Sequence, residues 1–134
     1  YKMYRIPGVV VTKAGTVLAY CEARKTGSDW ATIDILMRRS ADGGKTWGEP
    51  QKVADVPGPK ERSPVALAKK LGAKDDVTYN NPVMIADRGG AVHFVFCPEY
   101  MRCFYCRSDD DGKTWTKPTE ITALAFGPFK KELD

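Results

Sequence analysis

Long hydrophobic runs are missing from this sequence of 134 residues. No apolar stretch approaches the roughly 18 residues that a membrane-spanning helix requires, so no membrane span is expected. Long basic runs are missing as well: 21 Lys and Arg stand against 17 Asp and Glu, which leaves a net charge of +4. Because the basic residues are scattered, nucleic acid is not expected as a partner. With 43% hydrophobic and 28% charged residues, the composition is typical of a soluble globular chain.

Histidine is almost absent, since His93 is the only one. The cysteines Cys21, Cys97, Cys103 and Cys106 therefore fit no zinc pattern that includes histidine, and no metal is expected. Cys21 and Cys97 lie within apolar strand-like runs, so we predict that both are buried as small hydrophobic residues. Cys103 and Cys106 are three positions apart, which on a strand points them to opposite faces and argues against a redox pair.

An initiator methionine and a signal-like segment are also missing, because the chain begins at Tyr1 and opens directly on a predicted strand. We interpret this start as a boundary drawn inside a longer protein. On that interpretation, the missing signal peptide does not exclude export from the cell.

Short strands separated by turn residues dominate the pattern and predict an all-β chain. Four strands are predicted in each half, at 5–13, 16–24, 32–40 and 51–53, and then at 82–86, 91–97, 101–107 and 120–122. The intervening segment is rich in Pro, Lys and Asp. It holds one predicted short helix, with Ser63 as N-cap, Pro64 at its first position and Gly72 as its stop.

An internal repeat is the strongest feature of the sequence. Ser40–Pro50 and Ser108–Pro118 share seven identical positions at an offset of 68 residues. Each copy contains Ser-x-Asp-x-Gly-x-Thr-Trp, formed by Ser40, Asp42, Gly44, Thr46 and Trp47, and again by Ser108, Asp110, Gly112, Thr114 and Trp115. In such a turn the Asp carboxylate accepts backbone N–H groups, Gly supplies a positive φ, and Trp packs into the sheet. We therefore expect both Asp residues to be structural.

The repeated turn resembles the Asp-box of sialidase propeller blades, also called the BNR repeat. The resemblance implies four-stranded antiparallel blades of a six-bladed β-propeller, of which about two are present. Blade 1 is expected at about 1–56, an inserted loop with a short helix at 57–80, blade 2 at about 81–126 and a tail at 127–134. Because two blades cannot close a ring, the remaining blades of a parent chain are expected as partners.

The first residues resemble a motif of bacterial-type sialidases. Tyr4-Arg5-Ile6-Pro7 is similar to the Tyr/Phe-Arg-Ile-Pro sequence that opens their catalytic domain. The resemblance implies that Arg5 is one of three arginines that bind the carboxylate of sialic acid. The chemistry fits, because a guanidinium stays charged and binds a carboxylate through two parallel hydrogen bonds.

A second match follows the second predicted strand, where Glu22-Ala-Arg24-Lys-Thr-Gly-Ser-Asp29 resembles an Arg-x-Thr-Gly-x-Asp stretch of these enzymes. It implies that Asp29 is the general acid/base of the reaction. Arg24, supported by Glu22, is implied to contact the sugar near its 4-hydroxyl. Asp34 is a rival carboxylate, but it lies within a predicted strand and we interpret it as structural.

Further site residues are implied less directly. Asn81, in Asn80-Asn81-Pro82, matches a position near the acid/base, although Asn-Pro is also an ordinary turn start and both interpretations stay open. By resemblance to Bacteroides-type enzymes, Trp30, Tyr100 and Phe104 line the pocket for the N-acetyl group. Packing within the blades is the alternative for all three. His93 alternates with apolar neighbours and is predicted to be a core or inter-blade residue.

The resemblance extends from Tyr4 to about Pro118 and is to a Bacteroides-like exo-α-sialidase, or neuraminidase. It implies a glycoside hydrolase that removes terminal sialic acids from glycoconjugates with retention, without a cofactor, in a secreted or periplasmic protein. The family's Tyr nucleophile, its partner Glu and two arginines cannot be placed here, so the isolated chain is expected to be inactive. Two alternatives remain: a trans-sialidase, and a non-catalytic Asp-box propeller that binds glycans or proteins.

Overall fold

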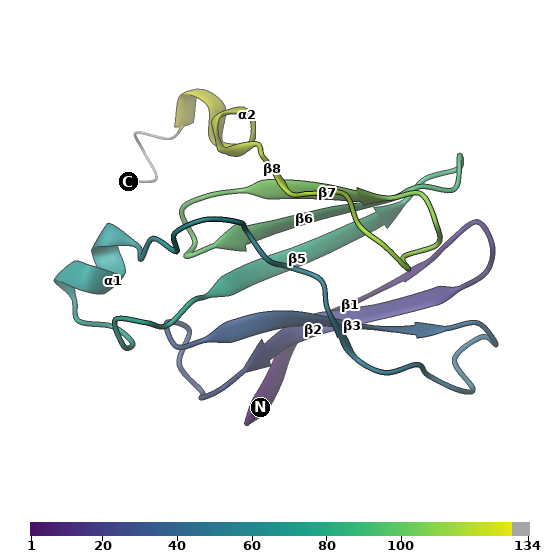
Figure 1. The fold of residues 1–134 in the computed structure, drawn as a ribbon, viewed down its shortest axis with the longest axis horizontal. Coiled ribbons are helices and arrows are strands. Elements are labelled where there is room, and N and C mark those ends of the chain that lie inside the picture. Colours follow the sequence, from purple (N-terminus) through teal and green to yellow (C-terminus); the bar gives the residue numbers. More distant parts are fainter. Residues whose placement is uncertain (130–134) are drawn as a thin grey trace.

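The computed structural model describes residues 1–129 and contains two four-stranded antiparallel sheets, shown one above the other in Figure 1. In each sheet the strands pair in sequence order. The first sheet holds β1 (Met3–Val11), β2 (Val17–Arg24), β3 (Ile33–Ser40) and β4 (Gln51–Lys52), and the second holds β5 (Tyr79–Ala86), β6 (Val92–Pro98), β7 (Phe104–Ser108) and β8 (Thr119–Glu120). The eight strands predicted from turn punctuation and the all-β class are thus confirmed.

Two strand starts differ from the sequence prediction by three residues each. β5 begins at Tyr79, earlier than predicted, because the chain is already paired there: Tyr79 lies opposite Pro98 of β6. β7 begins only at Phe104, because the preceding residues form a turn in which Met101 N–H donates to the Pro98 carbonyl at 3.3 Å. This later start leaves a loop between β6 and β7 that carries Tyr100.

The predicted short helix is present as α1 (Pro64–Ala68), with proline in its first turn as expected. Two details of the prediction are wrong. The Ser63 side chain makes no capping hydrogen bond, and the helix ends well before Gly72. It ends because Lys70 adopts a positive φ of 54°, while Leu71 N–H donates back to the Ala66 carbonyl at 2.8 Å.

The hydrophobic core lies between the two sheets, since both contribute alternate residues to one cluster. Its members include Leu18, Tyr20, Ile35 and Met37 from the first sheet and Tyr79, Met84, Phe94, Phe96 and Phe104 from the second. The last elements described are α2 (Thr122–Phe126) and η1 (Gly127–Phe129). Residues 130–134 of the expected tail lie outside the described part of the chain. No helix among residues 1–129 is both long and apolar enough to span a membrane.

The repeated turns are built alike at the ends of β3 and β7. In the first, the Asp42 carboxylate accepts the Thr46 N–H at 2.9 Å and the Ser40 hydroxyl at 2.7 Å. In the second, Asp110 accepts the Thr114 N–H at 2.9 Å and the Ser108 hydroxyl at 2.8 Å. The Thr hydrogen bonds, and after them the Ser hydroxyl, lower the pKa of each carboxyl to about 2.

The two turns differ in where their tryptophans lie. Trp115 packs against the core through Phe94, with ring centroids 5.5 Å apart and an edge-on geometry. Trp47 instead donates its indole N–H to the Gly44 carbonyl at 3.0 Å and lies on the outer face of the first sheet. Gly44 and Gly112 have φ values of 90° and 76°, as the sequence pattern requires.

A shared kink in the first strand of each sheet was not predicted. The pairing register shifts between Arg5 and Gly8 in β1 and between Asn80 and Val83 in β5. At each kink the residue before a proline, Ile6 or Asn81, has a φ of 52°. Bulges of this kind change the direction of the side chains beside them. Arg5 and Asn81, two of the candidate site residues, lie at these kinks.

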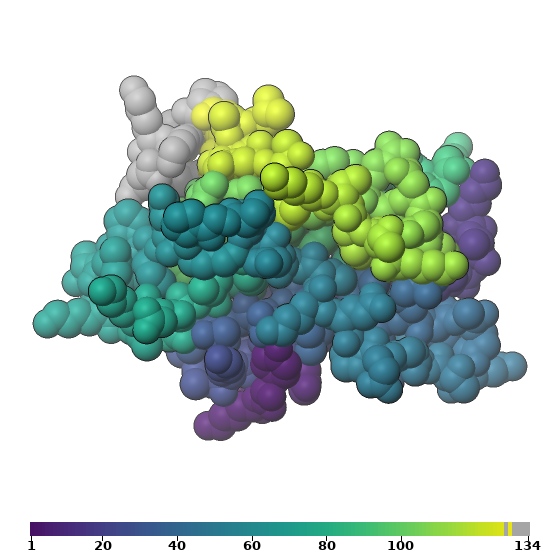
Figure 2. All heavy atoms as spheres, viewed as in Figure 1, coloured from purple at the N-terminus to yellow at the C-terminus, as the bar shows by residue number. Residues whose placement is uncertain are grey.

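The kink in β1 also joins the two sheets. A Cβ on Gly8 would lie 2.2 Å from the Tyr20 ring, so only glycine leaves room for that ring to pass beneath the strand. The Tyr20 hydroxyl then accepts the backbone N–H of Met84 in β5 at 3.0 Å. The space-filling view in Figure 2 shows the two sheets closely packed, with the inserted segment in teal covering one end.

Candidate functional site

Most candidate side chains come together at one end of the two sheets. Asp29 and Trp30 lie in the β2–β3 connection, and Tyr100 lies in the β6–β7 connection. Because the strands of each sheet alternate in direction, both connections are at the end opposite the Asp-box turns, on the same side as α1 (Figure 1). The kinked strands β1 and β5 bring Arg5 and Asn81 to this end.

The base of the cluster is a buried ion pair. The side chains of Arg24 and Glu22 are only 3% and 1% exposed, and the Arg24 Nη2 lies 2.6 Å from Glu22 Oε2. Arg24 Nε donates to the same oxygen at 3.0 Å, while Glu22 Oε1 accepts the Asn81 N–H at 2.9 Å. Burial alone would lower the pKa of Arg24, but its hydrogen bonds to Asp29 and Glu22 outweigh burial and raise it. Arg24 is therefore a fixed positive charge.

Two charged side chains lie above this pair and face solvent. Arg24 Nη1 donates to Asp29 Oδ1, and Arg5 Nη1 lies 3.6 Å from the same oxygen. The Arg5 and Asp29 side chains are 49% and 57% exposed. Within the described part of the chain, no hydrogen bond occupies the Arg5 guanidinium, so its donors are available to a ligand. A carboxylate and an accessible arginine thus stand side by side over a buried support.

An aromatic pair flanks the Asp29 loop. The rings of Trp30 and Tyr100 meet edge to face with centroids 5.0 Å apart, and the Tyr100 hydroxyl donates to the Asp29 carbonyl at 3.1 Å. Burial, followed by the charges of Asp29 and Glu22, raises the pKa of Tyr100 to about 12. The phenol therefore stays protonated and continues to donate at neutral pH. Residues from both sheets thus fix the position of Asp29.

Three other residues lie apart from this cluster. Phe104 is buried in the core, stacked on Phe96 with centroids 6.0 Å apart, so its ring offers no exposed surface to a ligand. Asp34 pairs with Lys52 at 2.9 Å, in keeping with its structural interpretation. His93 is half-buried between Asp87 and the Tyr105 hydroxyl, on the face of the second sheet that points away from the core. It is therefore not a core residue.

Sequence reasoning missed a second buried ion pair behind the site. Arg62 Nη1 lies 2.9 Å from Glu99 Oε1, and both side chains are almost fully buried. Arg62 also donates to the Trp30 carbonyl at 3.0 Å, while Glu99 accepts the Thr78 N–H at 3.0 Å. Glu99 and Tyr100 both have positive φ values, 57° and 59°. The pair therefore links the inserted segment to both connections that form the site.

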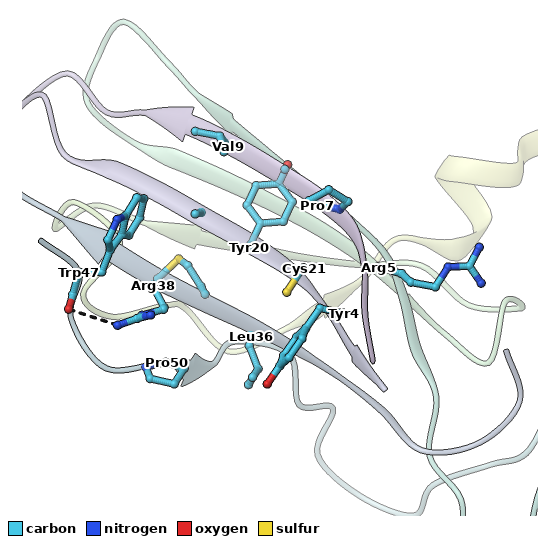
Figure 3. Close-up of a pocket in the computed structure, with 13 residues that line it drawn as sticks. Tyr4, Arg5, Pro7, Val9, Tyr20, Cys21, Leu36, Arg38, Trp47 and Pro50 are labelled. Atoms are coloured by element: carbon cyan, nitrogen blue, oxygen red, sulfur yellow. Dashed lines mark hydrogen bonds between the residues drawn. The ribbon is translucent and has the colours of Figure 1, made fainter. Parts of the chain in front are cut away.

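A large hollow lies elsewhere, on the outer face of the first sheet. Its volume is about 610 Å³, and its lining is mostly apolar, with Val9, Leu36, Trp47 and Pro50 among its residues. Figure 3 shows Tyr4 lying over this face, whereas the Arg5 side chain points away from it. The hollow is an open sheet surface that Arg5 also borders, whereas Glu22, Arg24 and Asp29 do not line it.

Comparison with known proteins gives a consistent result. The sialidase of Bacteroides fragilis is 27% identical over 149 aligned residues, which cover 93% of this chain and 25% of that protein. The sialidase of Micromonospora viridifaciens is 52% identical over 52 residues, or 38% of this chain and 8% of that protein. The solved Hadza microbial sialidase Hz136 superposes with a TM-score of 0.66 at 26% identity, over 89% of this chain and 26% of that one. No protein-family model matches the chain.

The two packed, four-stranded antiparallel sheets are blades of a β-propeller. The chain is related in sequence to sialidases, and its blades have the sialidase propeller fold. It spans about a quarter of the length of the Bacteroides fragilis relative.

Proposed function

We propose that the chain is part of the catalytic domain of an exo-α-sialidase, which hydrolyses terminal sialic acids of glycoconjugates with retention. One observation carries the proposal: Arg5 and Asp29, both half-exposed, lie with 3.6 Å between their charged groups. Residues from three separate stretches of sequence converge to hold them there. An anionic sugar acid requires a cation for its carboxylate and an acid for its glycosidic oxygen, and these two groups supply both.

In the proposed complex, Arg5 binds the substrate carboxylate. The Arg5 guanidinium is charged, and its N–H groups donate no hydrogen bond within the described part of the chain. It can therefore form two parallel hydrogen bonds to a carboxylate without breaking an existing one. The buried Arg24–Glu22 pair has a different role. Because Arg24 already donates to Glu22 and Asp29 and is only 3% exposed, it positions the Asp29 loop and leaves little surface for the sugar.

Asp29 is the proposed general acid/base. It protonates the leaving glycosidic oxygen in the first step and activates water in the second. Sialidases are an exception to the two-carboxylate rule of glycoside hydrolysis, because their nucleophile is a tyrosine. On this proposal the nucleophile and the remaining arginines come from other blades, and the 134-residue chain alone is inactive.

The aromatic pair forms one wall of the proposed pocket. Trp30 and Tyr100 present apolar surface beside Asp29, which suits the N-acetyl group of sialic acid and reduces the local access of water. Asn81, held through its backbone by Glu22, is proposed to lie at the substrate's edge. Phe104 is left out because it is buried. A trans-sialidase would use the same residues, and a secreted or periplasmic location remains part of the proposal.

The test is the Asp29→Asn variant in the protein that carries these residues together with its other blades. Hydrolysis of sialyl-lactose should fall by roughly 100-fold or more, the usual range for loss of a general acid. Hydrolysis of 4-methylumbelliferyl sialoside should fall much less, because its acidic leaving group needs little protonation. Equal losses of hydrolysis rate on the two substrates would show that Asp29 is not the general acid.

Asp109→Asn is the matched control. It also removes an exposed carboxylate paired with an arginine, at 2.7 Å from Arg107, but it lies in the second Asp-box at the far end of the blade. Both hydrolysis rates should stay near those of the wild type. If the wild type hydrolyses neither substrate, the non-catalytic propeller becomes the better interpretation, and Arg5 and Asp29 are then structural.

A further inference from the structure

Cys97 and Cys103 face each other across the β6–β7 hairpin. The antiparallel register of these strands ends with Phe96 opposite Phe104, and one further step places Cys97 opposite Cys103. Directly opposed residues of an antiparallel pair point to the same face. Phe96 points into the core, so Cys97 points to the other face of the sheet. The Cys103–Cys106 spacing in the sequence gives no sign of this pair.

The surroundings raise the pKa of both thiols. Burial of Cys97, followed by charge and hydrogen-bond interactions with the Cys103 thiol, raises the pKa of Cys97 to about 12. Burial also raises the pKa of Cys103. Cys103 is buried, whereas Cys97, like Cys21, is only partly buried, so the prediction that both are buried is wrong. Cys97 is therefore the sulfur that a reagent can approach.

The spacing of such a pair suits a covalent link. Directly opposed residues have Cα atoms about 4.5–5.5 Å apart, within the roughly 4.4–6.8 Å range of disulfides. We propose that Cys97 and Cys103 are a disulfide site. The other cysteines lack this arrangement: Cys21 belongs to the first sheet, and Cys106 faces Phe94 within the core.

The oxidant is a small-molecule disulfide. The Cys97 thiolate attacks one of its sulfurs and releases one small thiol, which leaves a mixed disulfide on Cys97. The Cys103 thiolate then attacks the Cys97 sulfur and releases the second small thiol. The two cysteines together lose two electrons and two protons, and the small disulfide gains them. Because both thiol pKa values are raised, the exchange is slow at neutral pH and faster in alkali.

The bond would close the loop of residues 98–102, which connects the second sheet to the candidate site. Within it, Glu99 holds Arg62 and Tyr100 donates to the Asp29 carbonyl. Both loop residues have positive φ values, a conformation that non-glycine residues adopt only when the surroundings enforce it. A disulfide at the base of the loop would restrict the other backbone conformations that residues 98–102 can adopt. The inference concerns the loop itself and does not depend on sialidase activity.

The test starts with the wild-type chain. It is incubated with oxidised glutathione at about pH 9, where thiol–disulfide exchange is favoured, and then denatured and alkylated. Four thiols should react before oxidation and two afterwards. Trypsin cuts after Arg88, Arg102 and Arg107, so a Cys97–Cys103 bond joins peptide 89–102 to peptide 103–107. Without reductant, mass spectrometry should find this joined pair two mass units below the sum of the separate peptides.

Two variants identify the sulfur within peptide 103–107. Cys106→Ala should still give the joined peptides, and Cys103→Ser should not. Fragmentation of the wild-type pair gives the same assignment without either variant, so poor folding of a variant does not block the test. Four reactive thiols after oxidation, a stable glutathione adduct on Cys97, or a bond through Cys21 or Cys106 would each overturn the proposal.

Discussion

At the scale of single residues, the site depends on charges that are buried as well as on charges that are exposed. Arg24 and Glu22 are nearly inaccessible, and the close contact between their opposite charges offsets part of the cost of burying them. Arg5 and Asp29 then rest on this support and remain open to solvent. Within eight residues of sequence, Glu22–Asp29, the chain thus carries both the buried support and an exposed carboxylate.

Glu22→Gln tests the buried support. Removing the carboxylate leaves the Arg24 guanidinium buried with half of its neutralising charge, and the free energy of unfolding should fall by about 3 kcal/mol. Urea unfolding followed by tryptophan fluorescence measures the change. Glu49→Gln, at an exposed glutamate just after the first Asp-box, is the control and should change stability by less than about 0.5 kcal/mol. Equal effects of the two variants would show that the Arg24–Glu22 pair contributes little.

At the scale of elements, the Asp-box turns are local devices, which is why their chemistry could be predicted from sequence. The Asp42 and Asp110 carboxylates make their hydrogen bonds within stretches of seven residues, Ser40–Thr46 and Ser108–Thr114. The positions of the strands follow from equally local turn signals. In such short patterns the hydrogen-bonding residues are all close in sequence. A single sequence is therefore enough to recognise them.

Contacts that join distant elements left no such signal. Arg62 and Glu99 are 37 residues apart, and no motif marks either one. The Cys97–Cys103 pair depends on where β7 begins, and the sequence prediction began that strand three residues too early. Phe104 was assigned to the site for the same reason, because an aromatic residue near a predicted loop cannot be told from one at the start of a buried strand.

The Asp-boxes make stability depend on pH. The folded pKa of Asp42 and Asp110 is about 2, below the ordinary value of 3.8. Their contribution is therefore complete above about pH 4 and is lost as the pH falls toward 2. Asp110→Asn should lower stability most at neutral pH, and its unfolding curve should converge with that of the wild type near pH 2.

Chemical denaturation between pH 7 and pH 2 measures this dependence. The double variant Asp42→Asn/Asp110→Asn should show a shallower acid dependence than either single variant. Lys113→Gln changes one charge of the same turn without touching these hydrogen bonds, so its curve should run parallel to that of the wild type. A constant difference between wild type and Asp110→Asn at all pH values would contradict the assignment.

At the scale of the whole molecule, the second Asp-box also fastens one blade to the other. The Asp111 carboxylate accepts the hydroxyls of Thr12 and Thr16, and Arg39 Nη2 lies 3.1 Å from it. The equivalent position of the first Asp-box is Gly43. A position that differs between the two Asp-boxes, Gly43 in the first and Asp111 in the second, thus supplies a contact between neighbouring blades.

Asp111→Gly isolates this contact. Asp111 has a φ of 67°, which glycine adopts without strain, so the substitution removes the side chain while favouring the same backbone. The free energy of unfolding should still fall, by about 1–3 kcal/mol. In a double-mutant cycle with Arg39→Met, the losses of unfolding free energy in the two single variants should not add up to the loss in the double variant. A stabilised Asp111→Gly variant would mean that relief of backbone strain exceeds the inter-blade hydrogen bonds.

The outer face of the first sheet determines how the isolated chain should behave. Val9 and Val11 are 63% and 59% exposed on β1, an edge strand beside the apolar hollow of about 610 Å³. Exposed apolar edge strands promote association. The 134-residue chain should therefore associate at concentrations of tens of micromolar, as measured by sedimentation velocity.

Val9→Lys/Val11→Lys should return the chain to a monomer, whereas Val65→Lys/Leu67→Lys, which alters exposed residues of α1, should not. A monomeric wild type would mean that the outer face of the first sheet stays exposed to solvent without causing association. If association depends on Val9 and Val11, the face behaves as half of an interface between blades. The same double lysine variant in a protein that holds further blades should then destabilise the propeller, because a charged pair would be buried where a neighbouring sheet packs.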